Sequence, residues 1–435
     1  MSVLDTLEQI CSRHGYLPME DLKSFSAKTG LPLPEIISIA SFYSFFAFEP
    51  GSETDHIENI YPLRAAGTLT RGGQYEWTAL EKARSGPGAV IGAIEAAGLT
   101  GRSGGGFPTA MKWEITAREK ADVKYVVCNA DEGEPGTGKD RFILENNPRA
   151  VIEGMAICAA AVGAGEGYIY LRGEYADLRE GIEQTIAAAP LGSFKLQLCM
   201  GHGAYVCGEE TALLDSIEGK RGEVRVKPPY PGAEGLWGRP TVVNNVETFA
   251  CVPYIINGVK VNTRVYTVFG CVKNPGVYEL GSGVTIAQLL EKAGGSETGV
   301  SAVLTGGGAG TLLPYEKVKD MPFIPDGCKA YGASYGTASV RFVSKSESLT
   351  ELVGELMAFF SEESCGMCAP CRTGMPRLLD ILSKMERYGT YPEDVALLRD
   401  TALHIRQNAR CGFGQAAVTP VLTLVENFPE VFSCC

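Results

Sequence analysis

Apolar residues recur along the first part of the chain at the spacing of amphipathic helices. Residues 18–30 carry Leu22 and Phe25 about one helical turn apart, and a second apolar run with prolines near its start follows at 32–46. Apolar positions three to four residues apart are typical of a helix that buries one face. We therefore expect a helical segment over residues 1–55.

The middle of the chain alternates between helical and strand-like patterns. Helical runs such as TALEKARSG and AVIGAIEAAG are followed by short β-rich runs such as VKYVVCNA and GYIYLRG. This alternation is typical of an α/β layer architecture. We therefore expect an α/β domain over residues 60–255.

Two further patterns divide the rest of the chain. Two β-rich runs flank the turn sequence Lys-Asn-Pro-Gly at 273–276, and a helical run then begins at Thr285. A hairpin followed by a helix fits a β-grasp domain, which we expect at 260–335. Three amphipathic runs predict a helical bundle over 345–435. The predicted fold class is α/β multidomain, with helical segments at both ends.

Composition and charge exclude several classes of protein. Hydrophobic residues make up 45% of the chain and charged residues 21%, as in ordinary globular proteins. The net charge of −12 argues against a nucleic-acid binder, because phosphate backbones are held by clustered Lys and Arg. The N-terminal sequence lacks the pattern of a targeting signal, and its most apolar stretch, 36–48, is shorter than the ~18 residues that a membrane span needs. We expect a cytoplasmic protein without direct membrane insertion.

Cysteines provide the sharpest chemical signal. Among 14 cysteines, Cys365, Cys368 and Cys371 are each separated by two residues, and Cys411 follows in ARCGFGQAA. Cytosolic thiols are kept reduced, so metal ligation explains this spacing better than disulfides do. Three thiolates at this spacing can hold three corners of a cubane while a distant cysteine binds the fourth iron, which predicts a [4Fe-4S] cluster. Structural zinc, which usually takes four cysteines as two separated pairs, is the alternative.

A glycine-rich stretch at 98–113, GLTGRSGGGFPTAMKW, is a candidate for binding a phosphate or a flat ring. Its glycines let backbone N–H groups approach a ligand closely, and Lys112 adds a positive charge. The spacing matches neither the Rossmann fingerprint nor the P-loop. A plain turn is the alternative interpretation.

Three carboxylates crowd into a second glycine-rich turn. Asp131, Glu132 and Glu134 follow a β-rich run in VVCNADEGEPGTGKDR. Carboxylates in such a turn can accept hydrogen bonds from flavin N–H groups or ribose hydroxyls. A solvated acidic loop is the alternative.

Other stretches add polar and aromatic groups. Glu209 and Glu210 form a carboxylate pair, which alone would also suit glycosidase-like chemistry, although no sugar-site pattern accompanies it. Residues 227–230 and 244–248 supply groups of the kind that nucleotide pockets use. The glycine-rich run at 305–314 is predicted to be a structural turn.

Taken together, these motifs resemble the family of FMN-containing, NADH-binding subunits. That family includes the flavoprotein subunit of respiratory complex I, the diaphorase subunit of soluble NAD-reducing [NiFe] hydrogenases, and the equivalent subunit of NAD-dependent formate dehydrogenases. The resemblance runs from about residue 60 to 430 in one order and includes all four cluster cysteines. It implies a Rossmann-like FMN and NADH domain, a β-grasp (ubiquitin-like) domain and a helical [4Fe-4S] domain.

The resemblance also implies roles for individual residues. Hydride would pass directly between NADH and FMN, so no side chain would act as a catalytic acid or base, and Glu210 would orient the cofactors. The residues implied on the NADH side are Phe107, Glu134, Glu210, Lys227 and Tyr230. The residues implied to hold FMN are Gly101, Arg102, Gly104, Gly105, Gly106, Lys112, Asn129, Asp131, Glu132, Tyr205, Gly208, Glu209, Asn244, Asn245 and Thr248.

Residues 14–50 resemble the helical half of the small [2Fe-2S] partner subunit of complex I. The four cysteine ligands that follow in that relative are missing here, so no [2Fe-2S] cluster is expected on this chain. The fusion favours the diaphorase subunit of an NAD-reducing hydrogenase over the equivalent subunits of complex I or of a formate dehydrogenase. Its partner would be a ferredoxin-like iron–sulfur subunit and, through it, a [NiFe] hydrogenase module.

Two other functions stay open from sequence alone. A zinc-stabilised scaffold that has lost its flavin would keep the cysteines but be colourless. A stand-alone NADH dehydrogenase would reduce a soluble acceptor directly, although a cluster without an onward partner argues against it. NAD(H) is favoured over NADP(H), because the acidic turn would repel a 2′-phosphate.

Overall fold

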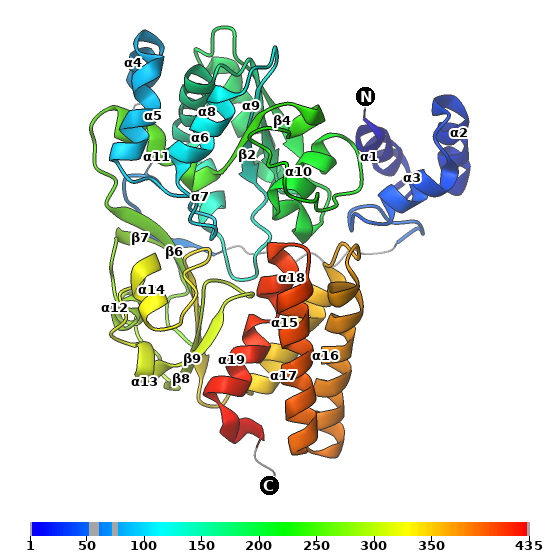
Figure 1. Cartoon of the computed structure of the whole chain (residues 1–435), viewed down its shortest axis with the longest axis vertical. Coiled ribbons are helices and arrows are strands. Elements are labelled where there is room, and N and C mark those ends of the chain that lie inside the picture. Colours follow the sequence, from blue (N-terminus) through cyan, green and yellow to red (C-terminus); the bar gives the residue numbers. More distant parts are fainter. Residues whose placement is uncertain (1, 52–60, 72–76, 433–435) are drawn as a thin grey trace.

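The N-terminal part of the chain forms three helices. The computed structural model describes residues 2–51, 61–71 and 77–432 (Figure 1). The third helix ends at residue 40, before the end of the apolar run at 32–46. The turns that follow it bury the side chains of Tyr43 and Phe46 against the next unit. The three helices are α1 (Val3–His14), α2 (Met19–Thr29) and α3 (Leu33–Ala40).

A sheet of four parallel strands, in the order β4-β3-β2-β5, is the centre of the next unit. Helices alternate with the strands, as the sequence pattern predicts. The strands are β2 (Tyr125–Ala130), β3 (Glu166–Leu171), β4 (Lys195–Met200) and β5 (Thr241–Asn245). The helices are α4 (Thr78–Ser85), α5 (Pro87–Ala96), α6 (Thr109–Arg118), α7 (Lys139–Asn146), α8 (Pro148–Val162), α9 (Arg179–Ala188), α10 (Glu210–Ile217) and α11 (Val246–Ile256), with short 3-10 turns at Gly173–Leu178, Tyr205–Gly208 and Leu236–Gly238.

Alternating residues of β2 face two different cores. Val126 and Cys128 pack with α4 to α9 and α11, whereas Tyr125 and Val127 pack with α10 and the three N-terminal helices. Parallel sheets are normally covered on both faces, because both sides of each strand are apolar. The N-terminal helices, which lie beside α10 in Figure 1, therefore complete the core of this sheet.

The second sheet is mixed and has six strands in the order β1-β7-β6-β10-β8-β9. It includes two strands from outside the predicted β-grasp segment of 260–335. β1 adds to the edge of the sheet, and β10 lies in its middle between β6 and β8. Such long-range pairing leaves no signal in a local hydrophobic pattern. The elements are β1 (Leu63–Ala65), β6 (Thr263–Gly270), β7 (Gly276–Gly281), α12 (Ile286–Lys292), β8 (Val300–Thr305), β9 (Thr311–Pro314), α13 (Tyr315–Val318), α14 (Pro325–Ala330) and β10 (Ser339–Ser344).

The C-terminal part is helical and packs its own core against one side of β8 and β9. Met357, Phe360 and Leu378 are fully buried in that core. No helix in the described ranges is long and apolar enough to cross a membrane. The elements are α15 (Leu349–Glu362), α16 (Ala369–Tyr388), α17 (Pro392–Asn408), α18 (Gly412–Ala417), α19 (Thr419–Asn427) and a 3-10 turn at Pro429–Phe432.

Gly154 marks the closest approach of α8 to α11, and its replacement tests this packing. A Cβ at Gly154 would lie 2.1 Å from the carbonyl oxygen of Phe249. Gly154→Ala should lower the free energy of unfolding by about 1–3 kcal/mol, because the two helices must separate. In α9, Gly181 has open space around it, so Gly181→Ala should gain about 0.5–1 kcal/mol. Denaturant midpoints measure both; equal stability of Gly154→Ala and wild type would contradict the contact.

Candidate functional site

One large cavity, of about 1050 Å³, lies at the carboxyl ends of β2 and β5. Ligands of open α/β sheets bind at this edge, and the volume is ample for a nucleotide cofactor. All the predicted cofactor-binding residues line it except Arg102 and Thr248. Those that line it are Gly101, Gly104, Gly105, Gly106, Phe107, Lys112, Asn129, Asp131, Glu132, Glu134, Tyr205, Gly208, Glu209, Glu210, Lys227, Tyr230, Asn244 and Asn245.

The glycine-rich loop folds back on itself at the cavity wall. The Gly101 N–H donates to the Phe107 carbonyl oxygen at 2.9 Å, which closes the loop. Gly104 and Gly106 have φ of +110° and +59°, in the region that residues with side chains rarely adopt. The loop therefore presents bare backbone to the cavity, as binding of a phosphate or a flat ring requires.

Arg102 and Thr248 support this loop from behind. The Arg102 N–H donates to Thr248 Oγ1 at 3.0 Å, and the guanidinium donates to Glu247 Oε1 at 2.9 Å and to the Thr263 carbonyl oxygen at 3.1 Å. The Arg102 and Glu247 side chains are almost fully buried, so this ion pair holds the guanidinium away from the cavity. Neither Arg102 nor Thr248 lines the cavity, which differs from the role that the resemblance implies.

Two lysines and two glutamates form a charged group in the cavity wall. Lys227 Nζ lies 2.8 Å from both Glu209 Oε1 and Glu210 Oε1, and Lys112 Nζ lies 2.9 Å from Glu210 Oε2. Burial alone would raise the pKa of Glu210, but the two ammonium groups outweigh it and leave that pKa lowered. Glu209 also caps α10 by accepting from the Thr211 and Ala212 N–H groups. The Glu210 carboxylate is therefore ionised, and both glutamate side chains are fixed in place.

The carboxyl groups of the acidic turn have raised pKa values, in contrast to Glu210. Burial raises the pKa of Asp131 to about 8, although Arg172 opposes the shift. Burial also raises the pKa of Glu132 and of Glu134. These carboxyl groups are therefore much easier to protonate near neutral pH than ordinary ones, whereas Glu210 stays charged.

A buried charge pair forms part of the cavity wall. Lys139 Nζ lies 2.5 Å from Asp140 Oδ1 and 3.1 Å from Asn245 Oδ1, and the Asn245 amide donates to Asp140 Oδ2 at 2.6 Å. Lys139 is 1% exposed, and Glu247 Oε2 lies 3.4 Å from its Nζ. Because Asn245 is held on one side by this pair, its position at the cavity wall is fixed.

Two other parts of the chain complete the wall. Glu134 accepts a hydrogen bond from the Tyr205 hydroxyl and another, at 2.8 Å, from the Ala309 N–H in the second sheet's β8–β9 loop. That loop, predicted to be a structural turn, lines the cavity at Gly306 and Ala309. On the helical side, Phe413 of α18 lies 5.5 Å from the Tyr205 ring, centroid to centroid. The cavity is thus shared by three units.

The four predicted cluster cysteines converge next to this wall. Cys368 precedes α16 and Cys371 lies in its first turn, while Cys411 precedes α18. Burial raises the pKa of the Cys371 thiol to about 12, with contributions from the nearby thiols of Cys368, Cys411 and Cys365. Burial also raises the pKa of the Cys411 thiol, although the Gly414 and Phe413 N–H groups, which donate to its sulfur, oppose that shift and favour a thiolate.

The donor set suits an iron–sulfur cluster. Four cysteine thiolates are the ligands that [4Fe-4S] clusters take. In the described part of the chain, no three His, Cys, Asp or Glu side chains gather as one metal ion requires. In a cubane each cysteine binds a different iron atom, so its ligands are spread over four corners.

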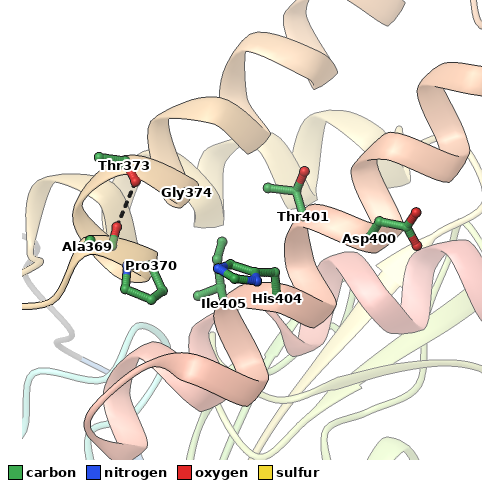
Figure 2. Close-up of a pocket in the computed structure, with 8 residues that line it drawn as sticks. All are labelled: Ala369, Pro370, Thr373, Gly374, Asp400, Thr401, His404 and Ile405. Carbon is green, nitrogen blue, oxygen red and sulfur yellow. Dashed lines mark hydrogen bonds between the residues drawn. The ribbon is translucent and has the colours of Figure 1, made fainter.

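A separate hollow of about 380 Å³ lies between the first turn of α16, which carries Cys371, and α17 (Figure 2). Ala369, Pro370 and Thr373 of α16 form one side, and Asp400 and His404 of α17 lie on the other. Thr373 Oγ1 donates to the Ala369 carbonyl oxygen at 2.7 Å, which stiffens the turn. The hollow shares no lining residue with the large cavity.

Sequence reasoning missed several residues of the cavity wall. Ile115 lies one α6 turn beyond Met111, just outside the glycine-rich stretch at 98–113. The Lys139–Asp140 pair resembles any exposed charge pair in sequence, and only its burial reveals it. Some others, such as Gly306 and Ser334, come from segments remote in sequence, whereas Ser103 and Gly133 directly adjoin predicted residues. The missed residues are Ser103, Ile115, Gly133, Thr137, Lys139, Asp140, Val206, Pro231, Gly232, Thr241, Val243, Gly306, Ala309, Ser334, Gly336, Thr337, Gly412, Phe413 and Ala416.

Three family models match consecutive parts of the chain. The Nuo51 FMN-binding domain matches residues 94–254, and the SLBB domain matches residues 265–308. The NADH-ubiquinone oxidoreductase-F iron-sulfur binding region matches residues 351–434. The first match covers most of the unit that contains the cavity, and the third covers all four cysteines.

Whole proteins are similar over most of the chain. The second F subunit of NADH-quinone oxidoreductase of Rhizobium meliloti (strain 1021) is 38% identical over 84% of this chain and 93% of its own length. The F subunit of NADH-quinone oxidoreductase of Escherichia coli (strain K12) is 39% identical over 80% of this chain and 84% of its own. A chain of an NAD+-reducing [NiFe]-hydrogenase, solved in the H2-reduced state, superimposes with a TM-score of 0.86 at 28% identity, covering 99% of this chain and 93% of that one.

The raised pKa of Asp131 predicts a pH-dependent stability. The folded state binds this proton more tightly than the unfolded state, so stability is lost as pH rises from the ordinary carboxyl range towards 8. Asn cannot lose a proton, so ligand-free Asp131→Asn should gain stability relative to wild type between pH 6 and 8.5, by about 2 °C or more in Tm. Exposed Asp122→Asn is the control. A Tm difference that does not change with pH would refute the shift.

Proposed function

The chain belongs to the family of NADH-quinone oxidoreductase F subunits, the NADH-oxidising flavoproteins that carry FMN and a [4Fe-4S] cluster, and we propose that it works as the diaphorase subunit of an NAD-reducing hydrogenase. The predicted cofactors and the predicted enzyme class are thereby confirmed. The assignment of individual residues, the terminal enzyme and the direction of electron flow are the parts that we propose.

The observation that carries this proposal is the shared wall between the cavity and the cysteines. Gly412, Phe413 and Ala416 line the cavity, and Cys411 directly precedes them. FMN, when bound, converts the two-electron hydride of NADH into single electrons that an iron–sulfur cluster can accept. A short protein path between the two sites suits that exchange.

We assign the inner cavity to FMN. The bare backbone of the glycine-rich loop suits a phosphate or an isoalloxazine edge, and Asn129, Asn244 and Asn245 offer amides at the strand ends. The protonated form of Asp131 would act as a hydrogen-bond donor as well as an acceptor near neutral pH. This carboxyl group can therefore satisfy a flavin carbonyl oxygen as well as an N–H group.

We assign the mouth of the cavity to NADH. Phe107 and Tyr230 are 46% and 60% exposed there, so both rings are free to stack on a base. Lys227 supplies positive charge for a phosphate, while the Glu210 carboxylate bridges Lys227 and Lys112. Since Glu210 stays ionised between two ammonium groups, its role is to orient them and not to transfer a proton.

The cluster ligands in this proposal are Cys365, Cys368, Cys371 and Cys411. Burial of their thiols limits water access, which tunes cluster potentials in general. An acceptor subunit would come closest to them at the outer side of the α16 turn, next to the hollow of Figure 2. We propose a ferredoxin-like iron–sulfur subunit as that partner, in a cytoplasmic assembly.

The N-terminal helices support the hydrogenase over complex I. The likeness to the hydrogenase chain covers 99% of this chain, so it includes α1 to α3. The matches to the two F subunits of NADH-quinone oxidoreductase cover 80–84%. In a hydrogenase, electrons would flow from the cluster to FMN and reduce NAD+. The subunits of complex I and of an NAD-dependent formate dehydrogenase are the alternatives, and a colourless zinc scaffold is the alternative from another class.

An anaerobic NADH titration of Cys368→Ala tests the proposed electron path. In wild type, NADH should bleach the flavin absorbance and give a four-iron EPR signal. Cys368→Ala should keep the bleaching and lose the four-iron signal, because FMN does not depend on that thiol. Cys271→Ala, at a thiol beside Gly299 far from the other cysteines in sequence, should leave both signals intact. Zinc in place of iron in wild type would overturn the proposal in favour of the scaffold.

The orienting role of Glu210 has its own test. Glu210→Gln leaves Lys112 and Lys227 without their shared carboxylate, so the KM for NADH should rise by about tenfold while kcat changes by less than about threefold. The matched control is Glu234→Gln, an exposed glutamate near Tyr230. A large fall in kcat with a new pH dependence, at normal NADH affinity, would show that Glu210 transfers a proton instead.

A further inference from the structure

Arg221 lies where three parts of the chain meet. It belongs to the loop that follows α10, and its guanidinium carbon lies 4.8 Å from the centre of the Phe42 ring in the N-terminal segment. Its Nη2 donates to the Cys365 carbonyl oxygen at 3.3 Å, and its Nη1 donates to Ser38 Oγ at 3.4 Å. Glu223 Oε1 lies 3.3 Å from its Nε. One side chain thus contacts the N-terminal helices and the cysteine-bearing loop at once.

Phe42 also reaches the cysteines. It packs against a small buried cluster that contains Val206, Val224 and Cys365, and Cys411 packs against the same cluster. A Cβ at Gly222 would lie 3.2 Å from the Phe42 ring, so the loop carrying Arg221 fits tightly against it. Phe42 therefore excludes water from one side of the cysteine group and holds the guanidinium over that side.

Hydrogen bonds attach the segment that carries Phe42 to the loops at 202–203 and 220. The Ser44 N–H donates to the Gly203 carbonyl oxygen at 3.0 Å and the Phe45 N–H to the His202 carbonyl oxygen at 3.2 Å. The Tyr43 hydroxyl donates to the Lys220 carbonyl oxygen at 2.7 Å, directly before Arg221. The turns after α3 therefore fix Phe42 and the Arg221 loop relative to each other.

A fixed cation at this position acts on the electron affinity of the cluster. Four thiolates give a [4Fe-4S] centre a negative charge that grows on reduction, so a nearby positive charge favours the reduced form. Other arginines near the cysteines are less effective: Arg372 and Arg410 are exposed, and water and salt screen their charges. The Arg221 side chain is 34% exposed and pairs with Glu223, and both facts limit but do not remove its effect.

We propose that Arg221 raises the reduction potential of the cluster, and that Phe42 of the N-terminal helical unit holds it in place for this purpose. The inference rests on the proposed function, namely that Cys365, Cys368, Cys371 and Cys411 bind the cluster. It gives the N-terminal unit a redox role: helices that carry no cofactor ligand of their own tune a cluster in another domain.

Redox titration of the purified protein, followed by low-temperature EPR of the cluster, tests this inference. Arg221→Gln should lower the equilibrium constant for cluster reduction by about tenfold, which is 59 mV for one electron. Arg221→Lys keeps the charge and should recover most of that loss. Phe42→Leu keeps an apolar cover but loses the ring, so it should shift the potential part of the way in the same direction. The matched control is Arg399→Gln, exposed on α17, which should not shift it.

The outcomes separate the two proposals. A wild-type protein without a four-iron signal would overturn the proposed function itself. With the signal present, an unchanged potential in Arg221→Gln, or equal shifts in Arg221→Gln and Arg221→Lys, would overturn the electrostatic role of Arg221. If Arg221→Gln fails to retain iron, the cluster potentials of Arg221→Lys and Phe42→Leu test the proposal instead. A potential equal to that of wild type in Phe42→Leu would overturn the role of Phe42. The FMN potential should stay the same in all four variants.

Discussion

The buried carboxylate of Glu134 constrains the whole centre of the molecule. It comes from the acidic turn after β2, and it needs hydrogen-bond donors, because an unsatisfied buried carboxylate is costly. Those donors are the hydroxyl of Tyr205 and the N–H of Ala309, which belong to different parts of the chain. A Cβ at Gly307 would lie 2.5 Å from the Glu134 side chain, so only glycine allows the β8–β9 loop to approach so closely. The cavity wall is therefore complete only when the second sheet is docked.

The same arrangement places the proposed flavin site and the proposed cluster site side by side. Tyr205, which donates to Glu134, has its ring 5.2 Å from Phe359 and 5.5 Å from Phe413, centroid to centroid, so the helical C-terminal unit is packed on the other side of the same residue. Cys411 is two residues from Phe413. A rigid contact of this kind would keep the two proposed sites at a fixed distance, so electron transfer between them would need no large motion. The carboxyl groups within the cavity differ in protonation state. Glu210 stays ionised between two lysines, whereas Asp131 is readily protonated.

The sequence predicted the candidate chemical groups better than it predicted the contacts between structural units. Cysteine spacing and the glycine-rich loop are local patterns, and both led to residues that the structure brings together around one cavity and its neighbouring thiols. Arg102 shows the limit of a motif, because its burial against Glu247 depends on a helix about 145 residues further along the chain. The edge strand β1 and the contacts of Arg221 were invisible for the same reason: each depends on pairing across the fold, which leaves no periodic signal. The apolar run at 32–46 suggested a helix longer than α3, which ends at Ala40. The apolar residues after Ala40 are buried too, but they lie in turns and not in a helix.

The N-terminal helices are best understood through the sheet that they cover. Tyr125 and Val127 of β2 point away from the helices of the main core, and a parallel sheet with one bare apolar face is unstable in water. Leu7 and Ile36 of the N-terminal helices, both fully buried, cover that face. A related flavoprotein without such helices must obtain the cover from another protein chain or from different residues. Because the helices that cover the sheet belong to the same chain, this face is always covered. The same packing places Phe42 next to the cysteines in every copy of the protein. Structural cover and contact with the cluster site are thus two consequences of one packing interaction.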